Sequence, residues 1–141
     1  MQGVKCFFDT NIVVYAFTYD EPYKKEIALN VIHNSIPYIS VQVIKEFINT
    51  LIRLGFKDIY EIENKCIEII NLFNIVNEEF EVITTALTIF ETYKFSFYDS
   101  MIISGALLSN CEILYTEDLQ HGQTIRNTLK VINPLFIKEH L

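Results

Sequence analysis

The sequence has few of the residues that divide a chain into domains. It contains only four glycines and three prolines in 141 residues, with no internal repeat and no low-complexity tract. Long apolar runs are also missing: none approaches the roughly 20 residues that span a bilayer. The N-terminus lacks the basic segment and long apolar run of a signal peptide. We therefore expect one domain over residues 1–141, no membrane association and a cytoplasmic location.

Cysteines and basic residues are scarce as well. Cys6, Cys66 and Cys111 are an odd number of widely spaced residues among apolar neighbours, which indicates free thiols in a reducing compartment rather than a disulfide framework or a zinc site. Eleven basic residues face 18 acidic ones, for a net charge of -7. Such a surface repels nucleic acid unless a local feature reverses the sign. The GxxxxGK[ST], GxGxxG and GxSxG motifs are absent, so three common catalytic and nucleotide sites are excluded.

Apolar residues, by contrast, are plentiful: half of the chain is hydrophobic and 13% is aromatic, enough for one sizeable core. Apolar residues at three-and-four spacing predict helices over residues 21–33, 41–54, 58–72, 78–93 and 97–109, with Asn77 as the N-cap of the fourth. Short apolar runs predict strands at residues 3–8, 38–39, 74–76, 112–115 and 130–132. This alternation predicts an α/β sandwich around a mostly parallel sheet.

Two acids follow predicted strands directly. Asp9 comes after the strand at residues 3–8, and Asp118 follows the strand at residues 112–115. Connections at the carboxyl ends of parallel strands line the usual ligand crevice of such folds. Each residue also has a plainer interpretation, as a turn or N-cap residue. Both interpretations can hold for the same side chain.

Two further acids lie on predicted helices. Asp99 shares a helical face with Ile102 and Ile103, so we expect its carboxylate at the rim of the interior, where an unpaired charge is costly. Its plainer interpretation is a first-turn acid favoured by the helix dipole. Glu46, taken alone, is typical of a solvated helix glutamate, because it lies opposite the apolar stripe formed by Ile44, Ile48 and Leu51.

If these four acids meet in one crevice, they require a counter-charge. Two unit charges about 4 Å apart repel by about 4 kcal/mol at an effective dielectric constant of 20. Mg²⁺ and Mn²⁺ prefer oxygen ligands and suit a site without His or Cys. Such an ion would also attract phosphate to an acidic protein, which makes phosphodiester hydrolysis the natural chemistry.

With these residues in view, the chain resembles the PIN-domain ribonucleases and, within them, the VapC-type toxins of toxin–antitoxin pairs. The resemblance extends over nearly the whole length, and the order and spacing of its motif blocks agree with the family. The blocks are Phe8-Asp9-Thr10-Asn11-Ile12, Ser40-Val41-Gln42-Val43-Ile44-Lys45-Glu46-Phe47, Phe97-Tyr98-Asp99-Ser100-Met101-Ile102-Ile103 and Leu114-Tyr115-Thr116-Glu117-Asp118-Leu119-Gln120-His121-Gly122.

The resemblance implies a PIN-like three-layer α/β/α sandwich with endonuclease activity on RNA that depends on Mg²⁺ or Mn²⁺. It also implies a homodimer and an antitoxin partner that blocks the site. The family's metal-binding and catalytic acids fall here on Asp9, Glu46, Asp99 and Asp118. Asn11 and Thr116 are expected to orient these groups through hydrogen bonds. Glu117 adds a carboxylate beside Asp118, and the family position favours Asp118.

Other interpretations remain open at this point. The chain could instead be a PIN-like RNA-processing or RNA-binding module that is not a toxin. A phosphoacceptor receiver domain is rejected, because Asp9 is not one of an adjacent acidic pair and Asn77, not an Asp, follows the strand at residues 74–76. Lys45, Lys94 and Arg126 lie nearest to the motif blocks and are candidates for phosphate contacts.

Overall fold

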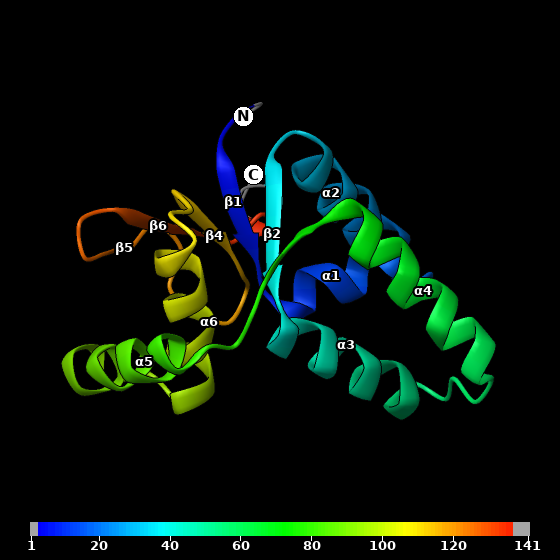
Figure 1. Ribbon diagram of the computed structural model, residues 1–141. Helices are drawn as coiled ribbons and strands as arrows, with labels where there is room; N and C mark the ends of the chain where they lie inside the picture. The colour runs from blue at the N-terminus through cyan, green and yellow to red at the C-terminus, as the bar shows by residue number, and fades with distance from the viewer. Residues whose placement is uncertain (1–2, 137–141) are drawn as a thin grey trace.

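The computed structural model describes residues 3–136. These residues contain a central six-stranded sheet with helices around it (Figure 1). The strand order is β3-β2-β1-β4-β6-β5. Parallel pairing joins β1 (Lys5–Phe8), β2 (Ile36–Ser40), β3 (Asn74–Val76), β4 (Ile113–Tyr115) and β6 (Leu129–Ile132). At one edge, β5 (Thr124–Ile125) pairs with β6 in the antiparallel sense. The prediction of a mostly parallel sheet is confirmed.

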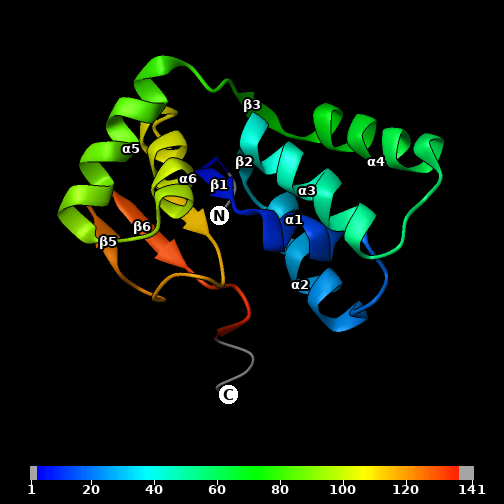
Figure 2. The same ribbon diagram turned by 90° about the horizontal axis from the view of Figure 1, so that it is seen from below.

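Helices cover both faces of this sheet (Figures 1 and 2). On one side lie α5 (Phe80–Tyr93) and α6 (Phe97–Leu108), and on the other lie α1 (Thr10–Phe17), α2 (Pro22–His33), α3 (Val41–Arg53) and α4 (Ile59–Leu72). The predicted three-layer α/β/α sandwich is therefore confirmed. Within residues 3–136, no helix combines the length and the apolar content needed to cross a lipid bilayer.

Three local features differ from the sequence prediction. Helix α1 was not expected, because a short continuous apolar run such as residues 12–17 does not distinguish a helix from a buried strand. Strand β5, which was also not expected, has only two residues. A tight turn, in which Arg126 and Asn127 both have positive φ, joins it to β6. Asn77 is not the N-cap of α5: Glu79 occupies that position, and its N–H donates 3.1 Å to the carbonyl of Asn77.

The central strand β1 is buried on both faces, as expected for a parallel sheet between helices. Cys6, Phe7 and Phe8 are fully buried. The ring of Phe8 stacks on Tyr115 with centroids 5.1 Å apart and meets the edge of Phe73 at 5.9 Å. Cys66 and Cys111 are free thiols like Cys6, as the sequence predicts, although Cys66 is only half-buried.

The sheet has a topological switch point between β1 and β4. These strands are neighbours, yet the chain continues from β1 through α1 and α2 to β2 on one side, and from β4 to β5 and β6 on the other. Connections that diverge in this way leave a crevice at the carboxyl ends of the two strands. This end of the sheet is the lower one in Figure 1 and faces the viewer in Figure 2.

Candidate functional site

Asp9 connects β1 to α1 at the switch point. It is buried, and its N–H donates to the carbonyl of Tyr115 in β4 at 3.0 Å. Both carboxylate oxygens accept hydrogen bonds: Oδ1 from the N–H of Thr10 at 2.7 Å, and Oδ2 from Oγ1 of Thr116 at 2.8 Å. Asp9 is thus the N-cap of α1, as its plainer interpretation states, and it also points into the crevice.

Asp99 and Asp118 meet Asp9 in that crevice. One carboxylate oxygen from each of the three residues lies within 4.8 Å of the others. Asp99 is half-buried in the first turn of α6, where Oγ of the N-cap Ser96 accepts from its N–H at 3.1 Å. Asp118 is exposed on the loop after β4. A helix start and two strand ends far apart in the sequence thus bring three acids together.

Glu46 is not part of this group of three. It is half-buried on α3, and its Oε1 accepts hydrogen bonds from Oγ1 of Thr10 at 3.1 Å and from Nε2 of Gln42 at 3.2 Å. Its charge is nevertheless close enough to raise the pKa of Asp9. The buried face of α3 also differs from the expected one: Val43, Phe47 and Leu51 are fully buried, whereas Ile44 and Ile48, on the face opposite Glu46, are only partly buried.

The predicted supporting residues divide into two groups. Thr116 is buried, and its Oγ1 both donates to Asp9 and accepts from the N–H of Asp118 at 3.1 Å. Asn11 lies beside Asp118 and lowers the pKa of that carboxyl, but its Nδ2 and Oδ1, both shielded from solvent, have no partner at hydrogen-bond geometry. Glu117 points away from the three acids and toward α1.

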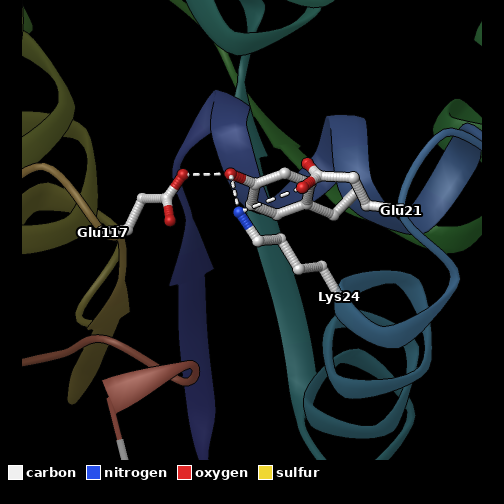
Figure 3. A network of polar contacts seen from close by, with 4 residues as sticks. Glu21, Lys24 and Glu117 are labelled. Carbon is white, nitrogen blue, oxygen red and sulfur yellow. Dashed lines mark hydrogen bonds and ion pairs between the residues drawn. The ribbon is translucent and has the colours of Figure 1, made fainter. Parts of the chain in front are cut away.

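The partner of Glu117 is Tyr15, which sequence reasoning missed. The Tyr15 hydroxyl donates to Oε1 of Glu117 and accepts from Nζ of Lys24 at 3.4 Å. Lys24 also pairs with Glu21 at 3.3 Å, so α2 supports the contact (Figure 3). Burial, followed by Glu117, raises the pKa of Tyr15 to about 12. The network ties the loop after β4 to α1 and accounts for the turn of Glu117 away from the acids.

The site is short of positive charge. Among residues 3–136, no ion pair involves any of the four acids. The pKa of Asp9 is raised to about 7: burial is the main cause, the charges of Asp118 and Glu46 add to the rise, and the hydrogen bonds from Thr116 and Thr10 oppose it. Burial, then Asp99 and Glu117, also raises the pKa of Asp118. The neighbouring carboxylates therefore disfavour ionisation of both Asp9 and Asp118.

Two grooves flank Glu46. One, of about 360 Å³, contains Asp118, Thr10, Asn11 and, on α3, Arg53. The other, of about 410 Å³, contains Lys45 and Tyr98. Arg53 was missed from the sequence, although its place seven residues after Glu46 puts it on the same helical face, which is a signal that the sequence offers.

The three bases predicted to contact phosphate lie in different places. Lys45 lines the second groove, where it pairs with Glu78 at 3.5 Å. Lys94 is the left-handed C-cap of α5, and Arg126 lies in the turn before β6, with its N–H bonded to the Tyr93 hydroxyl. Neither Lys94 nor Arg126 lines either of the two grooves described above.

Replacement of Thr116 by Val is expected to raise the pKa of Asp9 above about 7, because it removes one of the two hydrogen bonds to the ionised carboxylate. It also leaves the N–H of Asp118 without its acceptor, and we expect a cost of about 1–3 kcal/mol in unfolding free energy. Carbon-detected NMR titration and denaturant unfolding measure the two effects. Thr84→Val, on the exposed side of α5, is the control. An unchanged Asp9 titration would contradict the argument.

Comparisons with known proteins agree with this geometry. The family model described as "PIN domain" matches residues 6–125. A toxin–antitoxin complex from Klebsiella pneumoniae contains a similar fold, with a TM-score of 0.70, 21% identity and coverage of 92% of this chain and 97% of that chain. VapBC2 from Rickettsia felis, bound to a promoter DNA fragment, has a TM-score of 0.65 and 19% identity, with coverage of 92% of this chain and 100% of that chain. VapC20 from Mycobacterium tuberculosis, a sarcin–ricin loop cleaving toxin, has a TM-score of 0.66 and 12% identity, with coverage of 80% of this chain and 91% of that chain.

A search of the curated proteins gives no significant sequence match. The identities to the solved structures are low, so these structures show the shared fold alone. The family model is a stronger finding, because its match runs from β1 to β5 and includes all four acids. This chain belongs to the PIN domain family.

Proposed function

We propose that this chain is an endoribonuclease that depends on a divalent metal ion and acts as the toxin of a toxin–antitoxin pair. The observation that carries the proposal is the meeting of Asp9, Asp99 and Asp118 at the switch point between β1 and β4. The descriptions of structural neighbours support it: two are toxin–antitoxin complexes, and a third is a toxin that cleaves the sarcin–ricin loop.

The donor set fits Mg²⁺ or Mn²⁺. All the donors are carboxylate oxygens, which hard cations prefer, and no thiol or imidazole belongs to the group of three. The spread of at most 4.8 Å is close to the separation of about 4 Å between opposite ligands of one Mg²⁺. A cation there would offset the repulsion that raises the pKa of Asp9 and Asp118. The unpartnered amide of Asn11 adds polar atoms beside the same carboxylates.

The chain's own residues then have distinct tasks. Asp9, Asp99 and Asp118 would hold the ion, with Asp9 fixed by Thr10 and Thr116. When bound, the ion lowers the pKa of water and offsets the charge that develops on a phosphodiester. Glu46, which is oriented by Thr10 and Gln42 and lies outside the group of three, would accept a proton from the attacking water.

Arg53 is the cation of the groove that holds Asp118, and its Nη2 donates to Oγ1 of Thr50 at 3.3 Å. A planar guanidinium is suited to a phosphate oxygen pair. We therefore assign to Arg53 a phosphate contact on the substrate strand. Arg53 would thereby provide local positive charge for RNA on a chain whose net charge is -7.

Partner binding and self-association belong to the same proposal. An antitoxin protein would block the acidic crevice, and two copies of the chain would form a homodimer. On α5, Ile83, Leu87 and Phe90 are exposed at helical spacing, which is the kind of apolar surface that protein contacts bury.

The proposal is tested with the purified chain on structured RNA. We expect cleavage with Mn²⁺ or Mg²⁺, loss of cleavage when a chelator removes the ion, and recovery when the ion is restored. Circular dichroism at each step checks that the protein stays folded. Cleavage that continues unchanged in excess chelator would contradict the metal dependence.

The biological role is tested in cells. Expression of a toxin is expected to arrest growth, and co-expression of the product of the neighbouring reading frame should reverse the arrest. An inert outcome with active nuclease would favour an RNA-processing enzyme, and an inert outcome without nuclease activity would favour an RNA-binding module.

A further inference from the structure

Tyr98 is an aromatic residue that the proposed chemistry does not use. It lies in the first turn of α6, immediately before Asp99, and 67% of its surface is exposed. The ring touches Phe97 edge to face, with centroids 5.5 Å apart and 69° between the planes, so most of it remains in solvent. An exposed Tyr beside an acidic crevice is not needed for the core and calls for another explanation.

The backbone of Tyr98 is held at a fixed place relative to Glu46. Nε2 of Gln42, a buried residue of α3, donates to the carbonyl of Tyr98 at 3.4 Å and to Oε1 of Glu46 at 3.2 Å. One amide therefore joins the start of α6 to α3. Tyr98 is thus held between Asp99, which follows it on α6, and Glu46 on α3.

Tyr98 forms part of the wall of a groove of about 410 Å³, together with Gln42, Lys45, Glu46, Glu78 and Met101. That volume falls within the range of about 300–1,000 Å³ of small-molecule sites and suits one nucleotide. Glu46 also lines the groove that holds Asp118 and Arg53. The two grooves thus share Glu46, and the first of them contains Asp118 of the candidate catalytic centre.

The charges of this groove favour a base over a phosphate. Two carboxylates, Glu46 and Glu78, face one ammonium, Lys45, and would repel a phosphate seated among them. A nucleobase is flat, uncharged and rich in hydrogen-bonding groups, so the ring of Tyr98 and the carboxylates both suit it. The Lys45 side chain is 69% exposed, and its ammonium lies 3.5 Å from the Glu78 carboxylate, which is a loose ion pair. The ammonium therefore retains donors for a backbone phosphate near the groove.

We propose that this groove is a nucleobase subsite for single-stranded RNA, in which a base next to the scissile phosphate stacks on Tyr98 while Lys45 contacts the strand's backbone. This inference rests on the proposed ribonuclease function and specifies how that site holds its substrate. It makes Tyr98 a binding residue with no part in proton transfer or metal binding. The competing occupant is a segment of a partner protein, and the experiment below separates the two.

The test measures RNA binding without divalent ions, so that binding is scored independently of cleavage. The probe is a short, labelled single-stranded RNA of mixed sequence. Tyr98→Ala is expected to raise the Kd by about 5- to 150-fold, the range for loss of one base–aromatic stack, whereas Tyr98→Phe should bind like the wild type. Tyr60→Ala is the matched control, because Tyr60 is 74% exposed on α4 and lines neither groove that contains Glu46.

A spectroscopic arm reports stacking directly. The chain contains no tryptophan, so Tyr98→Trp and Tyr60→Trp each carry a single tryptophan, which can be excited at wavelengths where tyrosine does not absorb. We expect RNA to quench the emission of the first variant and to leave the second unchanged. In the cleavage assay, Tyr98→Ala should raise KM by a factor similar to its effect on Kd, with kcat within a few-fold of the wild type.

Equal RNA affinity of the wild type and Tyr98→Ala would overturn the subsite. So would a Tyr98→Ala variant that binds RNA normally but loses affinity for the antitoxin, since the groove would then hold protein. Failure of the wild type to cleave, with Tyr98-dependent RNA binding intact, would count against the nuclease proposal and leave the subsite standing.

Discussion

Asp9→Asn and Asp99→Asn are each expected to reduce RNA cleavage by about a thousandfold or more, since an ion that supplies several kcal/mol of transition-state stabilisation loses a charged ligand. Asn preserves the shape of the side chain, and at residue 9 its Oδ1 can still accept from the N–H of Thr10, so α1 keeps its cap. The loss therefore reflects charge and metal binding rather than misfolding. Initial cleavage rates with Mn²⁺, together with calorimetric Mn²⁺ titration, measure it.

Asp58→Asn is the matched control for these variants. Asp58 is the N-cap of α4, lies outside the acidic group and is exposed. Asn and Asp are about equally good N-caps, so both activity and stability should stay close to the wild type. Full activity in a folded Asp9→Asn or Asp99→Asn protein would remove the basis of the metal proposal.

The same Asp9→Asn variant should change the pH dependence of stability in the metal-free protein. The folded-state pKa of Asp9, about 7, lies above its ordinary value of 3.8, so the folded protein holds this proton more tightly than the unfolded chain. The tighter proton binding stabilises the folded protein fully below about pH 4. This stabilisation, up to about 4 kcal/mol of unfolding free energy, is lost as the pH rises to about 7. We expect Asp9→Asn to flatten this part of the plot of unfolding free energy against pH, and denaturant unfolding from pH 4 to pH 8 tests it.

Phe8→Ala is expected to lower the free energy of unfolding by about 3–5 kcal/mol, the cost of removing a fully buried aromatic side chain and leaving a cavity. Phe8 is fully buried in the central strand and contacts the rings of Tyr115 and Phe73. A domain of ordinary stability has only about 5–15 kcal/mol in total. Because Asp9 follows directly, the variant should also lose RNA cleavage.

Urea unfolding of both Phe8→Ala and Tyr60→Ala separates burial from residue type. Tyr60, 74% exposed on α4, should change stability by no more than about 0.5 kcal/mol when truncated, as is usual for surface positions. A Phe8→Ala protein as stable as the wild type would mean that the centre of the sheet is not packed as described.

Much of the fold follows from local patterns in the sequence. The predicted strands at residues 74–76 and 130–132 and the helix at residues 97–109 lie where the structure has β3, β6 and α6. Helix and strand periods are visible in sequence wherever one face is buried and the other is wet. The misses are where that contrast fails: α1 is a continuous apolar run, and β5 has two residues.

The site was predictable in part, for a different reason. Asp9 and Asp118 are identifiable because they follow apolar strands, and Asp99 because it heads an apolar helix face. The outward turn of Glu117 toward Tyr15, by contrast, depends on α1 and α2, which the spacing of residues 117 and 118 does not reveal. The place of Tyr98 beside Glu46 likewise depends on a hydrogen bond between α3 and α6.

The sequence by itself determined the class of the fold, the family of the chain and the acids to examine, because these follow from the order of residues along the chain and from the period of their burial. Only the tertiary structure decided which carboxylates share a space, that Glu46 lies beside the group of three rather than in it, and which bases and aromatic rings line the same grooves. The reason is physical: Thr10 and Glu46 are 36 residues apart and Asp9 and Thr116 are 107 apart, so the packing of the sheet and helices sets the distances between such side chains, and the local sequence pattern does not reveal them.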